Sequence, residues 1–315
     1  MKNLITGGAG FIGLHLTDFF LKKGHEIVVI DNLSWGRKQF IEHNFDNSRF
    51  TFLKIDLLDT KNLEKQLPSD IDIVYHLAAN SDIMRGAIDP SIDFKNTSIA
   101  TFNLLNTMRK KGIKKILFTS GSGVYGDVGH TYSSESFGPL LPISIYGAAK
   151  LSAEAMISAF VNLYDMQAWI LRPANIIGPR ATHGVIIDFI NRLKQNPTKL
   201  KIFGNGKQSK SYLYITDFID AINLIKNKSK DSINIFNLAS DTFITVNEIA
   251  ELVIREMNLQ HVKVIRGKEN RGWNGDVPVV RLCNTKLKKL GWKSKYTSKQ
   301  AVVKTIRILL GKKNT

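Results

Sequence analysis

The sequence predicts an α/β protein built on a doubly wound parallel sheet, with a smaller C-terminal α/β lobe. Short β-branched runs alternate with longer amphipathic runs as far as Arg172, which is typical of βαβ units. A glycine-rich loop joins the first β-branched run to the first amphipathic run. The 315 residues suffice for about two lobes.

Seven of the β-branched runs are predicted strands, because helices cover both faces of a parallel sheet and its strands are continuously apolar. They are Asn3–Thr6, Glu26–Ile30, Phe50–Lys54, Ile71–His76, Lys115–Thr119, Ala168–Leu171 and Asn234–Leu238. Three amphipathic runs between them are predicted helices, at Phe11–Lys23, Thr97–Lys111 and Ala148–Leu163. Gly24 follows the first of these helices, where a C-cap glycine is favoured.

Beyond Pro173, proline and glycine interrupt this rhythm, which indicates a second and less regular lobe. A helix is predicted at Val246–Glu256, because Thr245 and Glu248 have the spacing of a capping box. Shorter helices are predicted at Lys286–Leu290 and Lys299–Leu310. We therefore expect a first domain at 1–172 with a returning segment at 212–240, and a second lobe at 173–211 and 241–315.

The composition is that of a globular protein, with 43% hydrophobic and 23% charged residues. No apolar run approaches the roughly 18 residues of a membrane span, so no membrane partner is expected. Met1–Thr6 runs directly into a strand without the pattern of a cleavable signal. The one cysteine, Cys283, has no internal partner, so a reducing, cytoplasmic location is expected.

The net charge of +17 gathers near the C-terminus, where eleven Lys or Arg residues follow the last acidic residue, Asp276. Such a segment is compatible with a nucleic-acid surface, or with a solvated face that attracts phosphorylated substrates. No zinc-ligand spacing, basic repeat or aromatic-interleaved RNA motif accompanies it, which favours the solvated face and no specific nucleic-acid partner. The seven histidines show no HxH or HExxH spacing, so no metal site is expected.

Gly7, Gly10 and Gly13 form a GxxGxxG loop between the first strand and the first helix. Such glycines allow a sharp turn and close approach of backbone N–H groups to a pyrophosphate at the helix N-terminus. Asp31 ends the second strand, where a carboxylate accepts both adenosine ribose hydroxyls and repels a 2′-phosphate. These features predict a Rossmann-type site that prefers NAD to NADP. Further residues assigned to it are Phe11, Ile12, Asn32, Asp56, Leu57, Leu77, Ala78 and Ala79.

Tyr146 and Lys150 form a YxxxK pair at the start of a predicted helix, and four residues on a helix bring two side chains to one face. We expect the Lys150 ammonium to favour the phenolate and to lower the pKa of Tyr146. A hydroxyl-rich loop, Thr119–Gly126, follows the fifth strand, at the edge where open α/β sheets bind ligands. The pair and the loop together predict an acid/base site.

These motifs resemble the extended short-chain dehydrogenase/reductase family, and within it the nucleoside-diphosphate-sugar epimerases. The similarity extends over essentially the whole chain. Five motifs are typical of the superfamily: GGAGFIG, DNL at 31–33, HLAA at 76–79, TSGSGVYGD and YGAAK. Three are typical of the sugar-nucleotide branch: LRPANIIGPR at 171–180, FGNGKQSKSYLYITD, and RGWNGDV at 271–277.

The resemblance implies that Tyr146 is the catalytic acid/base, and that Lys150 binds the nicotinamide ribose and tunes Tyr146. It also implies a hydroxyl that hydrogen-bonds the sugar O4, but Gly121 stands where the family has this Ser or Thr. Ser120 and Ser122 are the alternatives, with Ser122 slightly favoured.

The resemblance also implies a set of substrate-binding residues in the second lobe. A small residue at 280, beside the sugar C2 substituent, predicts room for an N-acetyl group. A lysine at 210 replaces the usual phosphate-binding arginine, which keeps the charge but loses the bidentate fork. The four apolar members of this set are also compatible with a plain core. The set is Asn175 for the diphosphate and sugar, Val185, Ile186, Ile202 and Phe203 for the uridine, Tyr212 for the base or ribose, Lys210 and Arg271 for the phosphates, Asp276, and Val280.

The function implied is an NAD-dependent epimerase that inverts C4 of a UDP-hexose through a transient 4-keto intermediate. Its substrates are UDP-glucose and UDP-galactose, together with UDP-GlcNAc and UDP-GalNAc if Val280 leaves room. A homodimer through the helices Thr97–Lys111 and Ala148–Leu163 is implied as well. The alternatives are another nucleotide-sugar-modifying enzyme, a reductase or decarboxylase, or a non-catalytic nucleotide-sensing or RNA-associated protein. A 4,6-dehydratase is disfavoured, because Ser122 and Gly123 stand where such enzymes have Asp-Glu.

Overall fold

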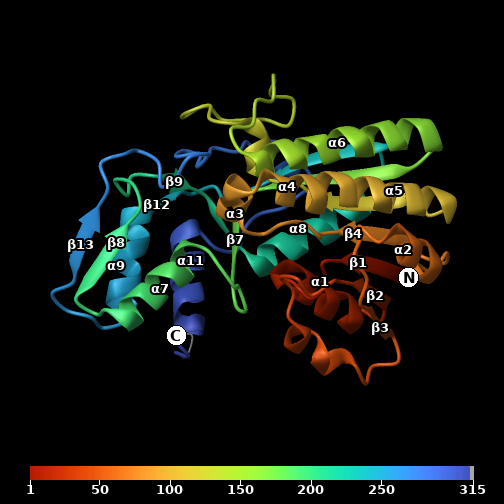
Figure 1. Ribbon diagram of the computed structural model, residues 1–315. Coiled ribbons are helices and arrows are strands. Elements are labelled where there is room, and N and C mark those ends of the chain that lie inside the picture. Colours follow the sequence, from red (N-terminus) through yellow and green to blue (C-terminus); the bar gives the residue numbers. More distant parts are fainter. Residues whose placement is uncertain (313–315) are drawn as a thin grey trace. The chain divides into compact units, whose positions relative to one another are not determined.

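A seven-stranded sheet organises the N-terminal part of the computed structural model, which describes residues 1–312 (Figure 1). All seven predicted strands are present in it, with ends that differ from prediction by two residues at most. They are β1 (Lys2–Thr6), β2 (Glu26–Ile30), β3 (Phe50–Leu53), β4 (Ile73–His76), β5 (Lys115–Thr119), β6 (Gln167–Pro173) and β11 (Ile233–Leu238). The α/β, Rossmann-type class predicted from the sequence is therefore confirmed.

The strand order is β11-β6-β5-β4-β1-β2-β3, and β3 to β6 pair in parallel through β2, β1, β4 and β5. The chain runs outward from β1 to β3 and then returns to β4 on the other side of β1. The order reverses at this point, so the carboxyl ends of β1 and β4 form the crevice in which open α/β sheets bind ligands.

Helices cover both faces of this sheet. On one face α2 (Thr60–Gln66), α5 (Ala100–Lys110) and α6 (Ile145–Tyr164) pack on a core that includes Leu104, Phe118 and Ile157. The helix α1 (Phe11–Lys22) lies on the opposite face (Figure 1), where the Phe20 and Tyr75 ring centroids are 4.9 Å apart.

The helix predicted at Thr97–Lys111 begins differently from the prediction. Two short helices, α3 (Ile83–Ile88) and α4 (Pro90–Asp93), are followed by a π-helix over Phe94–Ile99, which leads into α5. A π-turn holds more residues than an α-turn, so a search for the 3.6-residue period misses this segment. Such turns are frequent at functional sites.

The chain divides into two units that differ from the predicted domains. The first comprises 1–124, 144–172 and 222–236, and the second 125–143, 173–221 and residues from 237 onward. The segment 125–143 was expected in the first domain. It belongs to the second unit because the Ser133 carbonyl oxygen accepts from Asn237 Nδ2 at 2.9 Å and from the Cys283 N–H at 2.9 Å.

The second unit contains three small strand pairs with helices packed around them. The pairs are β7 (Asn175–Ile177) with β10 (Tyr212–Tyr214), β8 (Lys199–Ile202) with β13 (Lys263–Arg266), and β9 (Ser209–Lys210) with β12 (Ile244–Thr245). The helices are α7 (Val185–Gln195), α8 (Ile215–Lys228, shared with the first unit), α9 (Val246–Glu256), α10 (Thr285–Lys289) and α11 (Ser298–Leu309). The capping box predicted at Thr245 and Glu248 is present. Sequence patterns did not predict α7 and α8.

Several residues of the basic C-terminal segment are neutralised within the fold. Ion pairs join Lys288 to Asp241 at 2.7 Å, Lys295 to Asp220 at 2.7 Å and Arg307 to Glu256 at 3.0 Å. Part of the positive charge is therefore held in internal pairs. Within residues 1–312, no helix is both long and apolar enough to cross a membrane.

Candidate active site

The loop between β1 and α1 places the three glycines at the carboxyl edge of the sheet. Gly7 has a φ of 70° and lies against the segment after β4, where a β-carbon on it would be 2.8 Å from the Ala78 nitrogen. A β-carbon on Gly13 would be 2.4 Å from the Gly7 carbonyl oxygen. The helix α1 begins after Gly10 without a side-chain cap. The N–H groups of its first turn are thus left for an anionic ligand.

Asp31 follows β2, almost fully buried, with its carboxylate held by two backbone groups. Oδ2 accepts from the Ala9 N–H at 3.0 Å, and Oδ1 accepts from the Leu33 N–H at 2.8 Å. Burial raises the pKa of Asp31, and these two hydrogen bonds oppose the shift. A carboxylate has about four acceptor positions, so each oxygen keeps capacity for a ribose hydroxyl.

The remaining residues assigned to the cofactor fall into three groups. The side chains of Asn32 and Asp56 are hydrogen-bonded to each other, with Asn32 Nδ2 donating to Asp56 Oδ2 at 2.9 Å. Leu57 is buried in the core, so its side chain has a packing role. Partly exposed at the carboxyl edge are Phe11, Ile12, Leu77, Ala78 and Ala79.

Tyr146 and Lys150 lie in the first two turns of α6, which begins after the capping residue Ser144. Lys150 is only 3% exposed, and its Nζ donates to the Thr119 carbonyl oxygen at 2.7 Å. The same Nζ lies 5.7 Å from the centroid of the Tyr146 ring. The ammonium is therefore fixed beside the phenol, at the carboxyl end of β5.

The expected lowering of the pKa of Tyr146 is wrong for this structure. Burial raises the pKa of Tyr146 to about 12, and the negative charge of Asp93 adds to the shift. Burial also lowers the pKa of Lys150 to about 7, although Glu154 and Asp93 oppose this change. Removal from water penalises the charged form of both groups, and the attraction between ammonium and phenolate does not offset it.

The hydroxyl of Ser120 is engaged by a buried ion pair. Ser120 Oγ donates to Glu154 Oε1 at 2.5 Å. Arg172 donates to both oxygens of the same carboxylate, with Nε 3.0 Å from Oε1 and Nη2 2.6 Å from Oε2. All three side chains are buried. Glu154 lies on α6 one turn after Lys150, so this cluster supports the helix that carries the acid/base pair.

Two glycines face the phenol of Tyr146. A β-carbon on Gly121 would be 3.8 Å from the Tyr146 hydroxyl oxygen, and one on Gly123 would be 4.0 Å from its Cδ1. A side-chain hydroxyl at position 121 would therefore lie next to the phenol, but glycine stands there. Ser122, between the two glycines, is partly exposed at the start of the 3₁₀ turn Ser122–Tyr125.

Two cations of the second unit are paired with carboxylates. Lys210 Nζ lies 2.7 Å from Asp276 Oδ1, and the Gly272 N–H donates to Asp276 Oδ2 at 3.1 Å. Arg271 Nη2 lies 2.6 Å from Asp127 Oδ2. A diphosphate bound by either cation therefore competes with a carboxylate already present.

Other residues assigned to the substrate differ in exposure. Asn175 is exposed and hydrogen-bonds Tyr212, whose pKa burial raises to about 12. Ile186 and Ile202 are buried in the core of the second unit, which favours a packing role for both. At least partly exposed are Val185, Phe203 and Val280.

Sequence reasoning misses three charged side chains that contact or electrostatically influence the predicted residues, Asp93, Asp127 and Glu154, and it also misses Arg172, which pairs with Glu154. Glu154 has a local signal, because it follows Lys150 by four residues on one helix and so shares its face. The others have no such signal, since their partners lie far away in the sequence.

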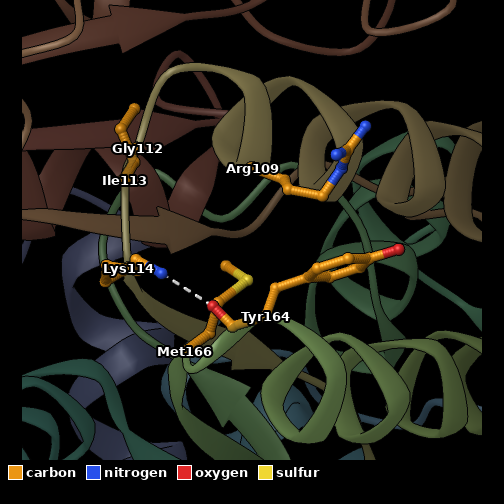
Figure 2. Close-up of a pocket in the computed structure, with 6 residues that line it drawn as sticks. All are labelled: Arg109, Gly112, Ile113, Lys114, Tyr164 and Met166. Atoms are coloured by element: carbon orange, nitrogen blue, oxygen red, sulfur yellow. Dashed lines mark hydrogen bonds between the residues drawn. The ribbon is translucent and has the colours of Figure 1, made fainter.

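A cavity of about 200 Å³ opens elsewhere in the first unit. Figure 2 shows Lys114 reaching the Tyr164 carbonyl oxygen across it, at 2.7 Å, below Arg109. Lys114 and Met166 immediately precede β5 and β6, so this cavity lies at the amino edge of the sheet. Tyr146 and Lys150 are at the carboxyl edge, and the cavity is therefore separate from the candidate site.

Comparison with known sequences decides the family. A sequence profile described as the NAD dependent epimerase/dehydratase family matches residues 3–239. The chain belongs to this family. Its cofactor is NAD, and the glycine loop, the uncapped helix α1 and the acceptor capacity of Asp31 fit that molecule.

Members of the family with different activities are similar to this chain. UDP-glucose 4-epimerase from Mycolicibacterium smegmatis is 29% identical over 322 residues, which cover 99% of each protein. UDP-glucuronic acid decarboxylase 1 from Arabidopsis thaliana is 31% identical over 261 residues, which cover 80% of this chain and 58% of the relative. The crystal structure of a UDP-galactose 4-epimerase is 35% identical, with 99% of each chain covered and a TM-score of 0.88.

Replacing Gly13 by alanine tests the assigned NAD loop. The new β-carbon would lie 2.4 Å from the Gly7 carbonyl oxygen, so the loop must open and α1 must shift away from the pyrophosphate position. We expect Gly13→Ala to weaken NAD binding by about tenfold or more, or about 1.4 kcal/mol, measured by calorimetric titration. Gly138→Ala is the control, because a β-carbon on Gly138 would have no atom within 4 Å. Equal NAD affinity in Gly13→Ala and wild type would contradict the assignment.

Proposed function

We propose that this enzyme is an NAD-dependent UDP-sugar 4-epimerase. One observation carries the proposal: the phenol of Tyr146 and the ammonium of Lys150 stand together at the carboxyl edge of the sheet, in the unit that holds the glycine loop. The likeness to a UDP-glucose 4-epimerase over 99% of both proteins supports it. The epimerase likeness covers the second unit as well, in which Asn175, Lys210, Arg271 and Asp276 are assigned to the nucleotide sugar.

In this proposal the Tyr146 phenolate removes the proton from the sugar O4, and the phenol so formed later returns it. When bound, NAD supplies reversible hydride acceptance from the sugar C4. The sugar then exists briefly as a 4-ketose, turns about its diphosphate, and is reduced on its other face, which inverts C4. Lys150 holds its charge beside the phenol and, tied to Thr119, positions the helix α6. The proton transfer by Tyr146 is general acid–base catalysis.

Ser122 is the hydroxyl we assign to the sugar O4. Ser120 is buried and donates to Glu154, whereas Ser122 is partly exposed. This difference favours Ser122 over Ser120, because the single proton of the Ser120 hydroxyl is already donated to Glu154 and is not available to a substrate.

A second candidate function is decarboxylation of a UDP-hexuronate. The 31% identity to UDP-glucuronic acid decarboxylase 1 favours it, and it shares the first oxidation at C4 with epimerisation. The two reactions differ in products, because only the decarboxylase releases carbon dioxide and forms a UDP-pentose.

Proton NMR of purified enzyme with each substrate tests the proposal. We expect UDP-glucose and UDP-galactose to interconvert without added reductant, and Tyr146→Phe to lower the rate by about 10²–10⁴-fold, since it removes the acid/base group. UDP-glucuronic acid in a parallel tube should yield no UDP-pentose. Pentose formation there, or no conversion of either hexose, would contradict the epimerase assignment.

The two serines provide matched variants in the same assay. Ser122→Ala should lower turnover by an order of 10², as expected when one donor to a reacting oxygen is lost. Ser120→Ala should keep turnover and lose about 1–3 kcal/mol of unfolding free energy, because buried Glu154 loses a hydrogen bond. The reverse pattern would reassign the hydroxyl to Ser120.

Val280 is the proposed determinant of substrate size. It is partly exposed. In this proposal its small side chain leaves room for an N-acetyl group on the sugar C2. We expect wild type to epimerise UDP-GlcNAc alongside UDP-glucose, and Val280→Tyr to lower the kcat/KM ratio of UDP-GlcNAc to UDP-glucose by about tenfold or more. Val280→Ala is the control and should keep the ratio. An unchanged kcat/KM ratio in Val280→Tyr would contradict the proposal that Val280 determines substrate size.

The protein is proposed to be a homodimer through α5 and α6. These neighbouring helices expose Phe102 and Leu163, and the Phe102 and Phe160 ring centroids are 6.2 Å apart. A dimer through these helices would remove these exposed apolar side chains from water. Sedimentation equilibrium should give a dimer for wild type and a monomer for Phe102→Glu. Trp35→Glu changes an exposed aromatic outside both helices and should stay dimeric. A monomeric wild type would refute the proposal.

A further inference from the structure

Trp35 and Arg85 form a contact between two segments of the first unit that both follow strands of the large sheet. The Arg85 guanidinium carbon lies 5.4 Å from the centroid of the Trp35 ring. Trp35 is in the loop after β2, and Arg85 is on α3, in the segment after β4. Both side chains are exposed, with 43% of the Trp35 surface accessible to solvent, so packing in the core does not account for their contact.

The strand order places this contact across the carboxyl end of β1. In the sheet β1 lies between β4 and β2, and it pairs in parallel with both. The segments that follow β4 and β2 therefore leave the sheet on either side of the β1–α1 loop, which is the glycine loop assigned to NAD. A contact between those two segments bridges that loop.

Both segments are also joined to the β1–α1 loop itself. After β2, the Arg37 N–H donates to the Ala9 carbonyl oxygen at 3.0 Å, and Asp31 Oδ2 accepts from the Ala9 N–H at 3.0 Å. After β4, the backbone approaches Gly7 so closely that a β-carbon on this glycine would lie 2.8 Å from the Ala78 nitrogen. With the contact between the exposed side chains, each of the three segments is linked to the other two.

Local contacts hold the backbone on both sides of the exposed contact. The loop after β2 returns over the Asp31 carboxylate at Gly36, where a β-carbon would lie 2.6 Å from Asp31 Oδ1. At the start of α3, the Arg85 N–H donates to Asp82 Oδ1 at 3.0 Å, and Asn80 Nδ2 donates to the Asp82 carbonyl oxygen at 2.7 Å. Rotation of the two side chains therefore breaks their contact without unfolding either segment.

We propose that Trp35 and Arg85 form a clasp across the loop that binds NAD, and that this clasp opens for the cofactor to enter or leave. The contact is made between protein groups alone, so it opposes entry and release alike. A cation–ring contact at an exposed site is weak, and its loss changes a rate by about two- to fivefold. The inference requires NAD as the cofactor and is independent of the sugar reaction.

Stopped-flow fluorescence of NADH tests the clasp. Mixing NADH with the purified protein gives the association rate, and displacement of bound NADH by excess NAD gives the dissociation rate. We expect Trp35→Ala and Arg85→Ala each to raise both rates by about two- to fivefold and to leave Kd within about twofold of wild type. Two unchanged rates would overturn the proposal. So would a weaker Kd with an unchanged association rate, because the side chains would then bind the cofactor directly.

The double variant shows whether the two side chains act as a pair. Combined Trp35→Ala and Arg85→Ala should release NADH no faster than either single variant, since each single change already removes the same contact. Effects on the release rate that multiply in the double variant would show two independent roles, and the clasp would be refuted.

Ile88→Ala is the matched control. Ile88 lies on α3, as Arg85 does, and is 86% exposed, so its truncation changes the surface of the same helix. This variant should bind and release NADH at the wild-type rates. An acceleration equal to that in Arg85→Ala would assign the effect to the helix and contradict the clasp. No sugar is present in these assays, so a failure of the proposed epimerase reaction leaves their result intact.

Discussion

The burial of one ammonium group is the constraint on which the rest of the candidate site depends. Lys150 is 3% exposed, and its Nζ donates to the carbonyl oxygen at the end of β5. That hydrogen bond ties the first turns of α6 to the carboxyl edge of the sheet and so places Tyr146 there. Because water is excluded, the Lys150 ammonium loses its hydration. Nearby negative side chains must then stabilise its charge.

Two buried carboxylates contribute to this balance and differ in their hydrogen bonds. Glu154 forms a bidentate pair with Arg172 and accepts from Ser120, so its charge is used to hold α6, β5 and β6 together. Asp93 accepts one hydrogen bond from Asn80 and keeps an oxygen without a partner among the described residues. Both carboxylates raise the pKa of Lys150, Glu154 more than Asp93, and so oppose the effect of burial.

Close backbone approach is the second requirement, and glycine meets it on two sides of the site. Gly7 and Gly13 let the β1–α1 loop contact the segment after β4 and fold back on itself. Gly121 and Gly123 leave the face of the Tyr146 phenol clear of side chains. The first pair lies in the loop assigned to the cofactor, and the second lies beside the Tyr146 ring.

The sequence by itself determined the seven strands, the glycine loop, the capping box at Thr245 and the placing of Tyr146 and Lys150 on one helix. Each is a property of residues within a few positions of one another, which periodicity and spacing report directly. Only the tertiary structure decided that Ser120 binds Glu154, that Asp93 acts on Lys150, and that burial raises the pKa of Tyr146. Those outcomes depend on which distant segments pack together and on how much water they exclude, and no local pattern encodes either.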